Sequence, residues 1–420
     1  MSDDYEVDKT LLKKKKPEVR MSIEQQHAVE LGTDTSKRLV GITGSAGTGK
    51  TFVLGQLHKE LKAHGELVTL CAPTGRAAKR IQELTGIPAK TIHRLLEFPM
   101  PGDPTENQKD AVSGEPKRRR GYPIDAKVVI VDESSMLSPT LYRQLLDAMP
   151  AGGCVRFFGD NRQLPPVEEG TPPFLDILEN QPSVELTYNY RSDDFIVSNA
   201  QLILRGRMPE RNPQFEIIYS HDPIRELVQF ATKEFMDMDH QIIMPTRKGK
   251  AGTVRVNPSL QLKFNGKGKM LRLDRFDEKE APLVIRGGDK YLWIKNDYKL
   301  EMFNGEIGKV DWVNEEDGTL KVLTADREIL VPAEVRTYSP WHGHMISYDP
   351  RKQIELGYAI TTHKSQGSEF HTIIYCMSAA QAYLLNRRNF YTGITRAKHQ
   401  VIIICDRKAM GLSLRPYKAY

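Results

Sequence analysis

The sequence predicts an α/β protein with parallel sheets flanked by helices and a small all-β module set inside the second of two α/β domains. Apolar strand patterns alternate with helical patterns along most of the 420 residues, which is typical of parallel sheets covered on both faces. Between about residues 286 and 352, short strand patterns alternate instead with Gly and Asn-Gly turns, which favours an all-β module. A chain of this length exceeds one typical core, so more than one domain is expected.

The composition describes a globular protein. Charged residues make up 27% and hydrophobic residues 39%, and we found no apolar run long enough to span a membrane and no signal-peptide core, so a cytoplasmic protein is expected. The four cysteines have scattered positions, which predicts buried thiols rather than disulfides or zinc ligands. A net charge of +6 and a pI near 8.9 are compatible with a nucleic-acid partner, but also with many other proteins.

A glycine-rich stretch near the N-terminus fits the pattern G-x-x-x-x-G-K-[ST], whose backbone N–H groups cradle phosphates. An apolar strand pattern over residues 38–43 precedes it, and an amphipathic stripe of Val53, Leu57 and Leu61 follows. Because a helix N-terminus presents free N–H groups and a positive dipole, this arrangement predicts a nucleotide site. The alternative is a tight glycine turn. The stretch comprises Gly44, Ser45, Ala46, Gly47, Thr48, Gly49, Lys50 and Thr51.

The N-terminal region is expected to contain a tail and a first helix. Residues 1–20 are polar and include four lysines at 13–16, which predicts a disordered tail; a nucleic-acid-touching arm and a targeting signal are the alternatives. Ser22 can cap the helix that follows, with Gln25 as its capping-box partner. The carboxamide of Gln25 also matches the donor and acceptor of adenine, so this residue has two interpretations.

Residues 97–125 interrupt the strand-helix alternation with prolines and glycines. The stretch is too long for an ordinary connection, so it is either a functional insertion or a disordered loop. It ends in a run of four basic residues, 117–120. This run is expected to lie along a phosphate backbone or to be solvated.

Polar and charged residues at four later places predict hydrolysis of the bound nucleotide. Asp132 and Glu133 follow an apolar strand, where the first can hold Mg²⁺ and the second can activate water; helix capping is the alternative. Gln163, past another strand end, can contact the γ-phosphate or be an ordinary polar loop residue. Arg191 and Arg396 are the candidates for positive charge at the transferring phosphoryl group, where such an arginine is worth roughly 10³–10⁵ in rate.

Eight motifs in a fixed order resemble those of superfamily 1 helicases, most closely the RecD/Dda-type branch. The resemblance covers about residues 21–410, and the THKSQG and TGITRAK segments are highly specific together. The motifs are GSAGTGKT (44–51), APTGRAA (72–78), TIH (91–93), VDES (131–134), GDNRQLPPV (159–167), YRS (190–192), AITTHKSQGSEF (359–370) and YTGITRAK (391–398).

The resemblance implies two RecA-like P-loop domains with ATP in the cleft between them and single-stranded DNA across their tops. The first domain is expected at residues 21–195, with 97–125 as a short pin-like insertion. The second is expected at residues 196–285 and 353–420, with an SH3-like β insertion at 286–352. The compact chain resembles the short, phage-type members.

The resemblance also assigns residues at the ATP site. Lys50 and Thr51 would hold phosphate and Mg²⁺, Asp132 would share the Mg²⁺, and Glu133 would be the catalytic base. Gln25 would read adenine, and Glu369 would touch the ribose. Gln163 would be the γ-phosphate sensor, with Arg191 and Arg396 completing the site.

On the DNA side, five residues match motifs that face the strand: Pro73, Thr74, His93, Thr362 and His363. Threonine and histidine can bond phosphate oxygens without reading sequence, although ordinary turn chemistry is the alternative for each. In the pin-like insertion, Phe98 and Met100 are the apolar candidates for a strand-separating wedge.

The function so predicted is an ATP-dependent DNA helicase that moves 5′→3′ on single-stranded DNA and unwinds duplex DNA. The alternatives are an RNA or ribonucleoprotein-remodelling helicase, because no residue tests for the 2′-OH, and a non-catalytic nucleotide-gated binding module. The expected partners are single-stranded DNA, single-strand/duplex junctions, and single-stranded-DNA-binding or replication proteins. No membrane is expected, and two ATP-binding halves on one chain predict a competent monomer.

Overall fold

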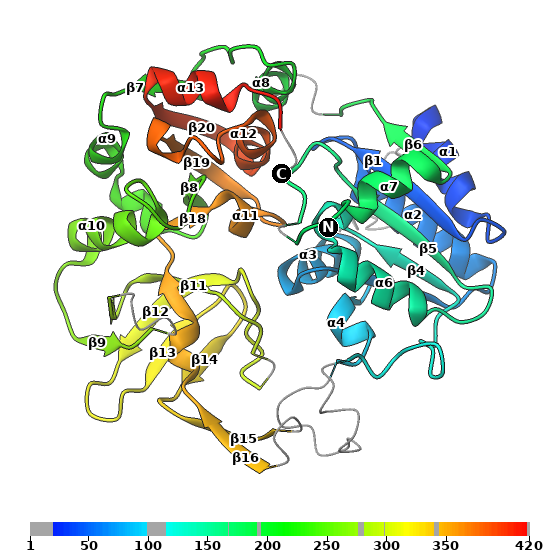
Figure 1. Ribbon diagram of the computed structural model, residues 1–420, viewed down its shortest axis with the longest axis horizontal. Helices are drawn as coiled ribbons and strands as arrows, with labels where there is room; N and C mark the ends of the chain where they lie inside the picture. The colour runs from blue at the N-terminus through cyan, green and yellow to red at the C-terminus, as the bar shows by residue number, and fades with distance from the viewer. Residues whose placement is uncertain are drawn as a thin grey trace, which may run out of the picture.

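The computed structural model describes residues 20–98, 115–166, 168–190, 195–275, 281–297, 299–339 and 344–417. Within these ranges the chain forms two α/β domains and a β module (Figure 1). The predicted disordered tail up to residue 19, Met100 and Arg191 lie outside the described residues. Among the helices that are described, none is both long and apolar enough to cross a membrane.

The first α/β domain contains a six-stranded sheet in the order β3-β2-β4-β5-β1-β6. Each neighbouring pair is parallel, as the strand-helix alternation predicts. The two central strands, β4 and β5, are completely buried, because helices cover both faces of the sheet. The strands are β1 (Leu39–Gly44), β2 (Val68–Ala72), β3 (Ala89–Thr91), β4 (Val128–Val131), β5 (Cys154–Gly159) and β6 (Ser183–Leu186).

Two apolar cores lie on the two faces of this sheet. One contains Val53, Leu57 and Leu61, the predicted stripe, all fully buried. The other contains Leu141 and Leu145 of α6. The helices are α1 (Ile23–Thr33), α2 (Lys50–Ala63), α3 (Gly75–Thr85), α4 (Ile92–Leu95), the 3₁₀ turn η2 (Ser134–Met136), α6 (Pro139–Asp147) and α7 (Pro173–Asn180).

The second α/β domain contains a five-stranded parallel sheet in the order β18-β8-β19-β20-β7. Apolar cores again lie on both of its faces, so the prediction of two α/β domains is confirmed. Its strands are β7 (Phe215–Tyr219), β8 (His240–Met244), β18 (Ala359–Thr361), β19 (Phe370–Met377) and β20 (Ala397–Cys405). Its helices are α8 (Phe195–Leu204), α9 (Pro223–Phe230), η3 (Lys233–Met236), α10 (Thr253–Asn265), α11 (Thr362–Ser365), η5 (Ala379–Gln381), α12 (Arg387–Ile394) and α13 (Arg407–Ser413).

The β module is built from antiparallel strands around a core that includes Tyr291 and Trp293. Its main sheet has the order β14-β13-β12-β11-β17, and two hairpins, β9-β10 and β15-β16, adjoin it. The strands are β9 (Met270–Leu273), β10 (Leu283–Arg286), β11 (Lys290–Trp293), β12 (Ile307–Val313), β13 (Leu320–Leu323), β14 (Glu328–Val331), β15 (Val335–Ser339), β16 (His344–Tyr348) and β17 (Ile354–Leu356), with the 3₁₀ turn η4 (Pro350–Gln353) before β17.

The edges of the β module differ from the predicted residues 286–352. Leu271 and Leu273 of β9 and Ile285 of β10 belong to its core, and β17 pairs with β11. We therefore place the module at about residues 270–356. The short β9 pattern falls among glycines and lysines, so its two buried leucines give no clear strand signal in sequence.

The β module is anchored to the second domain by a buried carboxylate. Asp289 is completely buried and accepts hydrogen bonds from Gln261 Nε2 (2.5 Å), Asn265 Nδ2 (2.7 Å) and Tyr358 OH (2.7 Å). Burial raises the pKa of Asp289 despite these donors. The neighbouring Lys290 donates through Nζ to three main-chain carbonyls of the second domain, those of residues 235, 237 and 240.

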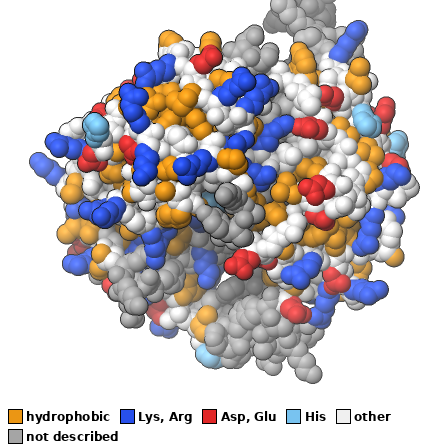
Figure 2. All heavy atoms as spheres, turned by 45° about the horizontal axis from the view of Figure 1, so that its top comes forward, with side chains coloured by type: hydrophobic (Ala, Val, Ile, Leu, Met, Phe, Trp, Pro, Cys, Tyr) orange, Lys and Arg blue, Asp and Glu red, His pale blue; other side chains and the backbone are white. Residues whose placement is uncertain are grey.

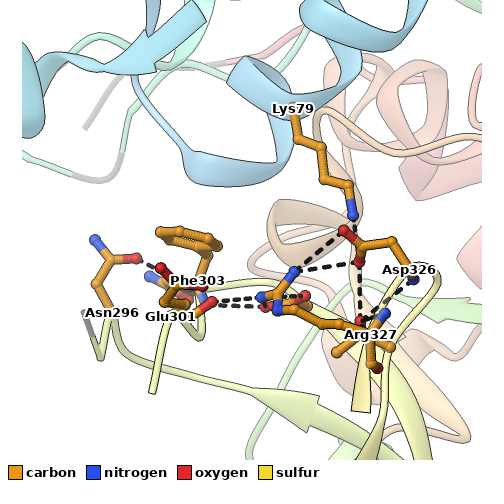
Figure 3. A network of polar contacts seen from close by, with 9 residues as sticks. Lys79, Asn296, Glu301, Phe303, Asp326 and Arg327 are labelled. Carbon is orange, nitrogen blue, oxygen red and sulfur yellow. Dashed lines mark hydrogen bonds and ion pairs between the residues drawn. The ribbon is translucent and has the colours of Figure 1, made fainter. Parts of the chain in front are cut away.

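The contact between the β module and the first domain is more open to solvent. Lys79 of α3 extends to Asp326, with 2.6 Å between Nζ and Oδ1, and their side chains are 36% and 47% exposed (Figure 3). Arg327 beside it pairs with Asp326 and with Glu306. At the other end of this contact the ring of Phe303 packs on Gly75, where any Cβ would lie 2.6 Å from its Cγ.

The described ends of the predicted insertion lie side by side. The backbone N–H of Lys117 donates to Glu97 O and that of Arg118 to Leu96 O. Within the basic run, the Arg118 side chain is only 12% exposed and pairs with Glu97 (2.7 Å) and Asp125 (3.0 Å). The expectation that the whole run is solvated or follows a phosphate backbone is therefore wrong for Arg118, because nearby carboxylates neutralise it within the protein.

Candidate active site

The glycine-rich loop joins the carboxyl end of β1 to the first turn of α2. Gly47 and Gly49 have φ values of 85° and 81°, which non-glycine residues rarely adopt. A Cβ on Gly49 would lie 2.6 Å from Gln25 Nε2, so a larger residue there would displace the Gln25 side chain from the loop. The N-terminus of α2 adjoins this bend and has no side-chain cap, so its first backbone N–H groups are left for a ligand such as phosphate.

Lys50 lies at the start of α2 and folds across the loop. Its Nζ donates to Gly44 O (2.7 Å) and Ser45 O (3.0 Å), and Thr48 Oγ1 donates to Ser45 O (2.9 Å). An ammonium group held at the mouth of a phosphate cradle can move to a phosphate oxygen with a side-chain rotation. Lys50 and the next residue, Thr51, both line a cavity beside the glycine-rich loop.

Asp132 and Glu133 follow β4, and the structure brings them to the same cavity. Asp132 Oδ1 accepts a hydrogen bond from the Glu133 N–H at 2.8 Å. Burial, and then the Glu133 carboxylate beside it, raise the pKa of Asp132 to about 6. Glu133 has a φ of 50°, a left-handed conformation that is unusual for glutamate. Such strain at a polar residue is common in active sites, because the surrounding structure must hold it there.

The cavity measures about 340 Å³ and opens between the two α/β domains. From the first domain, Lys50, Asp132, Glu133 and Gln163 line it. From the second domain, Glu369, Thr395 and Arg396 do so. The structure thus brings together predicted residues that are separated by more than 300 positions in the chain.

Arg396 is nearly buried, with 3% exposure, and its guanidinium is held in place from three directions. Nε donates to Thr392 O (3.1 Å), Nη1 to Ser368 O (3.4 Å) and Nη2 to Thr395 Oγ1 (3.2 Å). Gln163 is 6% exposed, and its Oε1 has no hydrogen-bond partner in the described part of the chain. A buried acceptor or carboxamide of this kind is costly to leave unpaired, which favours a ligand or water beside it.

Gln25 forms the predicted capping box and also contacts the glycine-rich loop. Ser22 Oγ accepts from Gln25 N–H, and Gln25 Oε1 accepts from Ser22 N–H. Gln25 Nε2 donates to Thr48 O (3.3 Å), and Tyr190 OH donates to Gln25 Oε1 (2.9 Å). The capping interpretation is therefore confirmed, and the adenine interpretation stays a prediction.

Tyr190 and Arg80 are among the lining residues that were not singled out from the sequence. Tyr190 lines the cavity beside Gln25, and its N–H donates to Gly47 O (3.1 Å). Arg80 of α3 pairs with Glu369 at 2.5 Å. Burial disfavours the charge of Arg80, but the carboxylates of Glu369 and Glu133 outweigh it and raise its pKa. The position of Tyr190 within the YRS motif could have indicated its place in the cavity. No sequence signal indicated Arg80, because its partner comes from the other domain.

The segment after Thr362 and His363 of the second domain lies near Thr74 of the first domain. Thr74 Oγ1 caps α3 by accepting from Ala77 N–H, and a Cβ on Gly367 would lie 3.8 Å from that oxygen. Burial lowers the pKa of His93 and of His363, so both imidazoles are neutral at pH 7. The Nδ1 atom of His93 has no partner among the described residues. Pro73 is half-buried at the end of β2 beside Thr74.

Two of the residues predicted to contact DNA, Thr362 and Phe98, make contacts within the protein. Thr362 is completely buried, and its Oγ1 donates to Met244 O (3.3 Å), so its side chain holds α11 rather than facing solvent. Phe98 is half-buried, packs against the core under α4, and lies with its ring centroid 4.9 Å from that of His93. The wedge role of Phe98 and the strand contact of Thr362 stay predictions, and neither side chain is free.

Positive charge is concentrated at one end of the second domain. Figure 2 shows many Lys and Arg side chains, and few Asp or Glu, in the region where α13 and the end of α8 lie in Figure 1. Arg205, Arg207, Arg407, Lys408 and Arg415 are exposed there. A surface of this sign attracts polyanions such as nucleic acid.

Comparison with known proteins agrees with this geometry. The family described as "AAA domain" matches residues 20–228, and "UvrD-like helicase C-terminal domain" matches residues 356–404. The ATP-dependent RecD2 DNA helicase of Deinococcus radiodurans is 32% identical over 385 residues, which are 90% of this chain and 48% of that protein. The helicase dda of Enterobacteria phage T4 is 24% identical, over 88% of this chain and 94% of that protein.

The chain belongs to the RecD/Dda-like helicases of superfamily 1. It spans about half the length of its Deinococcus relative. Among solved structures, the Pif1 helicase of Bacteroides bound to single-stranded DNA matches 93% of this chain with a TM-score of 0.56 at 21% identity, which supports the fold. The family resemblance in the sequence is thereby confirmed.

Proposed function

We propose that this protein is an ATP-dependent DNA helicase that moves 5′→3′ on single-stranded DNA and unwinds duplex DNA. The observation that carries the proposal is the shared cavity, which joins the glycine-rich loop and Asp132-Glu133 of one domain to Arg396 of the other. A nucleotide held by both walls would favour the closed arrangement of the domains. Hydrolysis would remove this link between the two walls and allow the domains to open, which would couple ATP hydrolysis to domain motion.

The residues present fit Mg²⁺ and ATP. A glycine loop with two positive φ values that leads into the N-terminus of α2 fits a phosphate cradle. Thr51 and Asp132 would hold the metal together with phosphate oxygens, since Mg²⁺ is bound through one or two protein ligands plus substrate. The described residues contain no group of three or more His, Cys, Asp or Glu for a metal, which suits this mode. Bound Mg²⁺ would neutralise charge on the phosphates.

The roles of the protein side chains follow from their positions. Lys50 would neutralise the phosphates from the first domain, and Glu133 would orient and deprotonate the attacking water. Gln163, with a free acceptor at the cavity wall, would sense the γ-phosphate. Arg396 would stabilise charge on the transferred group, and Arg191 is proposed to assist it. Gln25 and Tyr190 fit the base, and Glu369 the ribose.

We propose single-stranded DNA as the track, held by main-chain groups and side chains near Thr74, His93 and His363. The relatives named as DNA helicases favour DNA over RNA. Because both halves of the cavity come from one chain, a monomer would be competent, and single-stranded-DNA-binding or replication proteins are proposed protein partners.

The test uses partial duplexes with either a 5′ or a 3′ single-stranded tail, together with phosphate release on poly-dT and poly-U. We expect unwinding from the 5′ tail and stronger stimulation by poly-dT. Glu133→Gln should lower DNA-stimulated hydrolysis by at least about 100-fold while ATP still binds. Unwinding only from the 3′ tail would refute the polarity, equal stimulation by poly-U would favour the RNA alternative, and absence of phosphate release would favour a non-catalytic binding module.

A further inference from the structure

The backbone of Leu164, the residue after Gln163, is held by the second domain on both of its polar groups. Its N–H donates to Thr392 Oγ1 at 2.9 Å, and its carbonyl accepts from Gln366 Nε2 at 3.0 Å. All three residues are buried: Leu164 is 3% exposed, Thr392 0% and Gln366 6%. No element of the first domain supplies these two bonds, so separating the domains would leave both groups of Leu164 without them.

Gln163 depends on this attachment because its own side chain is unsupported. Its Oε1 has no partner among the described residues, whereas its N–H donates to Asp160 O at 3.1 Å within the same loop. The loop therefore fixes Gln163 on one side, and the second domain fixes it on the other. The Gln163 carboxamide at the cavity wall needs both attachments, because misplacing a catalytic group by about 1 Å can cost on the order of 100-fold in rate.

Thr392 and Gln366 also contact other parts of the ATP site and of the DNA side. The Thr392 carbonyl accepts from Arg396 Nε, so one residue contacts both the Gln163 loop and the arginine of the cavity. Gln366 is the C-cap residue of α11, and its N–H donates to His363 O at 3.3 Å. A shift of α11 at the DNA side would thus move the carboxamide that holds Leu164.

We propose that the second domain positions Gln163 for hydrolysis through the Leu164 peptide, with Thr392 and Gln366 as positioning residues, and that Gln366 transmits DNA binding at α11 to Gln163. The inference deepens the proposed ATPase function and rests on it. Hydrolysis is then fast only when the domains are docked, because docking completes the hydrogen bonds of the Leu164 peptide.

The first test replaces the hydroxyl of Thr392. Thr392→Val keeps the shape but removes the acceptor, and Thr392→Ser retains it. With saturating ATP and oligo-dT, Thr392→Val should lower kcat by about tenfold or more, while KM for ATP and the Kd for oligo-dT change less than about threefold. Thr392→Ser should stay within about threefold of the wild type. Equal kcat values for Thr392→Val and the wild type would overturn the proposal.

A matched control separates positioning from general damage to the interface. Tyr391 OH donates to Asp160 Oδ2 at 2.6 Å, so Tyr391→Phe also removes one buried bond between the domains, but it leaves the Leu164 peptide intact. Its kcat should fall by less than about threefold, and thermal unfolding would verify that each variant is folded. An equal loss of kcat in Tyr391→Phe and Thr392→Val would show that the Leu164 peptide has no special role among the bonds between the domains, and would reject the proposal.

The second test asks whether the effect passes through Gln163. On a Gln163→Ala background, Thr392→Val should cause no further loss of kcat, because the group that it positions is gone. Full additivity would reject the proposal. If Gln163→Ala itself hydrolysed ATP like the wild type, the proposed sensor role of Gln163 would fail instead, so the two failures are distinguishable.

The third test concerns DNA. Gln366→Met keeps the length of the side chain but donates no hydrogen bond to Leu164 O. We expect it to lower the stimulation of hydrolysis by oligo-dT by about tenfold, with DNA-free hydrolysis and the Kd for oligo-dT changed less than about threefold. A proportional loss with and without DNA would limit the role of Gln366 to the interface and overturn its part in the transmission.

Discussion

The β module meets the two α/β domains through interfaces of different kinds. Toward the second domain it presents Asp289 and Lys290, which are completely buried and hydrogen-bonded to groups of that domain. Toward the first domain it presents Asp326, which is 47% exposed and pairs with Lys79 (Figure 3). Buried polar networks are costly to break, whereas exposed ion pairs contribute only about 0–1 kcal/mol.

This difference indicates which parts of the molecule move together. The β module and the second domain share a buried network, so we expect them to act as one body. The contact with α3 consists of the exposed, salt-sensitive Lys79–Asp326 pair, a hydrogen bond from Arg76 Nη1 to Gly305 O and the packing of Phe303 on Gly75. We expect this contact to open at a smaller penalty than the buried network when the first domain shifts. The proposed function, in which the two α/β domains open and close, would use one interface of each kind.

The largest expected effect is on the buried side. Asp289→Asn replaces an acceptor oxygen with an NH₂ group that faces donors from Gln261 and Arg286 or from Asn265 and Tyr358. We expect a loss of about 3 kcal/mol in the free energy of unfolding, measured by urea denaturation. The matched change on the exposed side, Asp326→Asn, should cost less than about 0.5 kcal/mol. Equal losses would remove the distinction between the two interfaces.

A second effect of intermediate size concerns pH. Burial lowers the pKa of Lys290 to about 7, whereas an unfolded lysine titrates near its ordinary value of 10.5. Because the folded pKa is depressed, burying the charged form penalises folding below pH 7, and this penalty fades as pH rises toward 10.5. The unfolding free energy of the wild type should therefore rise by about 2 kcal/mol between pH 7 and 9 relative to Lys290→Met. A constant difference across this range would show that the lysine stays charged when buried.

The smallest effect is on the exposed interface. Lys79→Ala removes the ion pair with Asp326 and should change the free energy of unfolding by less than about 0.5 kcal/mol, with any difference from the wild type vanishing above about 0.5 M NaCl. Thermal unfolding at low and high salt measures this. Lys59→Ala, on the exposed face of α2, is the control for loss of one surface charge. A salt-independent loss of about 2 kcal/mol in the free energy of unfolding would show that the Lys79–Asp326 contact resembles the buried interface in strength.

Parts of the site that depend on adjacent residues could be predicted from sequence. The glycine loop, the Lys50 that follows it and the Asp132-Glu133 pair each lie at the end of one strand, where local backbone geometry fixes the direction of the side chain. The capping box of Ser22 and Gln25 is local in the same way. The four cysteines are also buried and unpaired, as their spacing predicts.

Contacts between distant segments could not be predicted in this way. Nothing near Arg80 in the chain indicates that it pairs with Glu369. Nothing near Thr362 indicates that its hydroxyl donates a hydrogen bond to Met244 O. The basic run at 117–120 reads as solvated charge, yet Arg118 is neutralised by Glu97 and Asp125, 21 and 7 positions away. Charge and polarity are visible in sequence, but which partner satisfies them is not.

The sequence by itself determined the nucleotide loop, the order of the motifs and the α/β class, because these follow from residues within a few positions of each other. Only the tertiary structure decided that Leu164 is held by Thr392, 228 positions later, and that the β module shares buried charged groups with one domain but an exposed ion pair with the other. Hydrogen bonds of that kind depend on how two separately folded sheets dock, and docking is set by the packing of whole surfaces rather than by any local pattern.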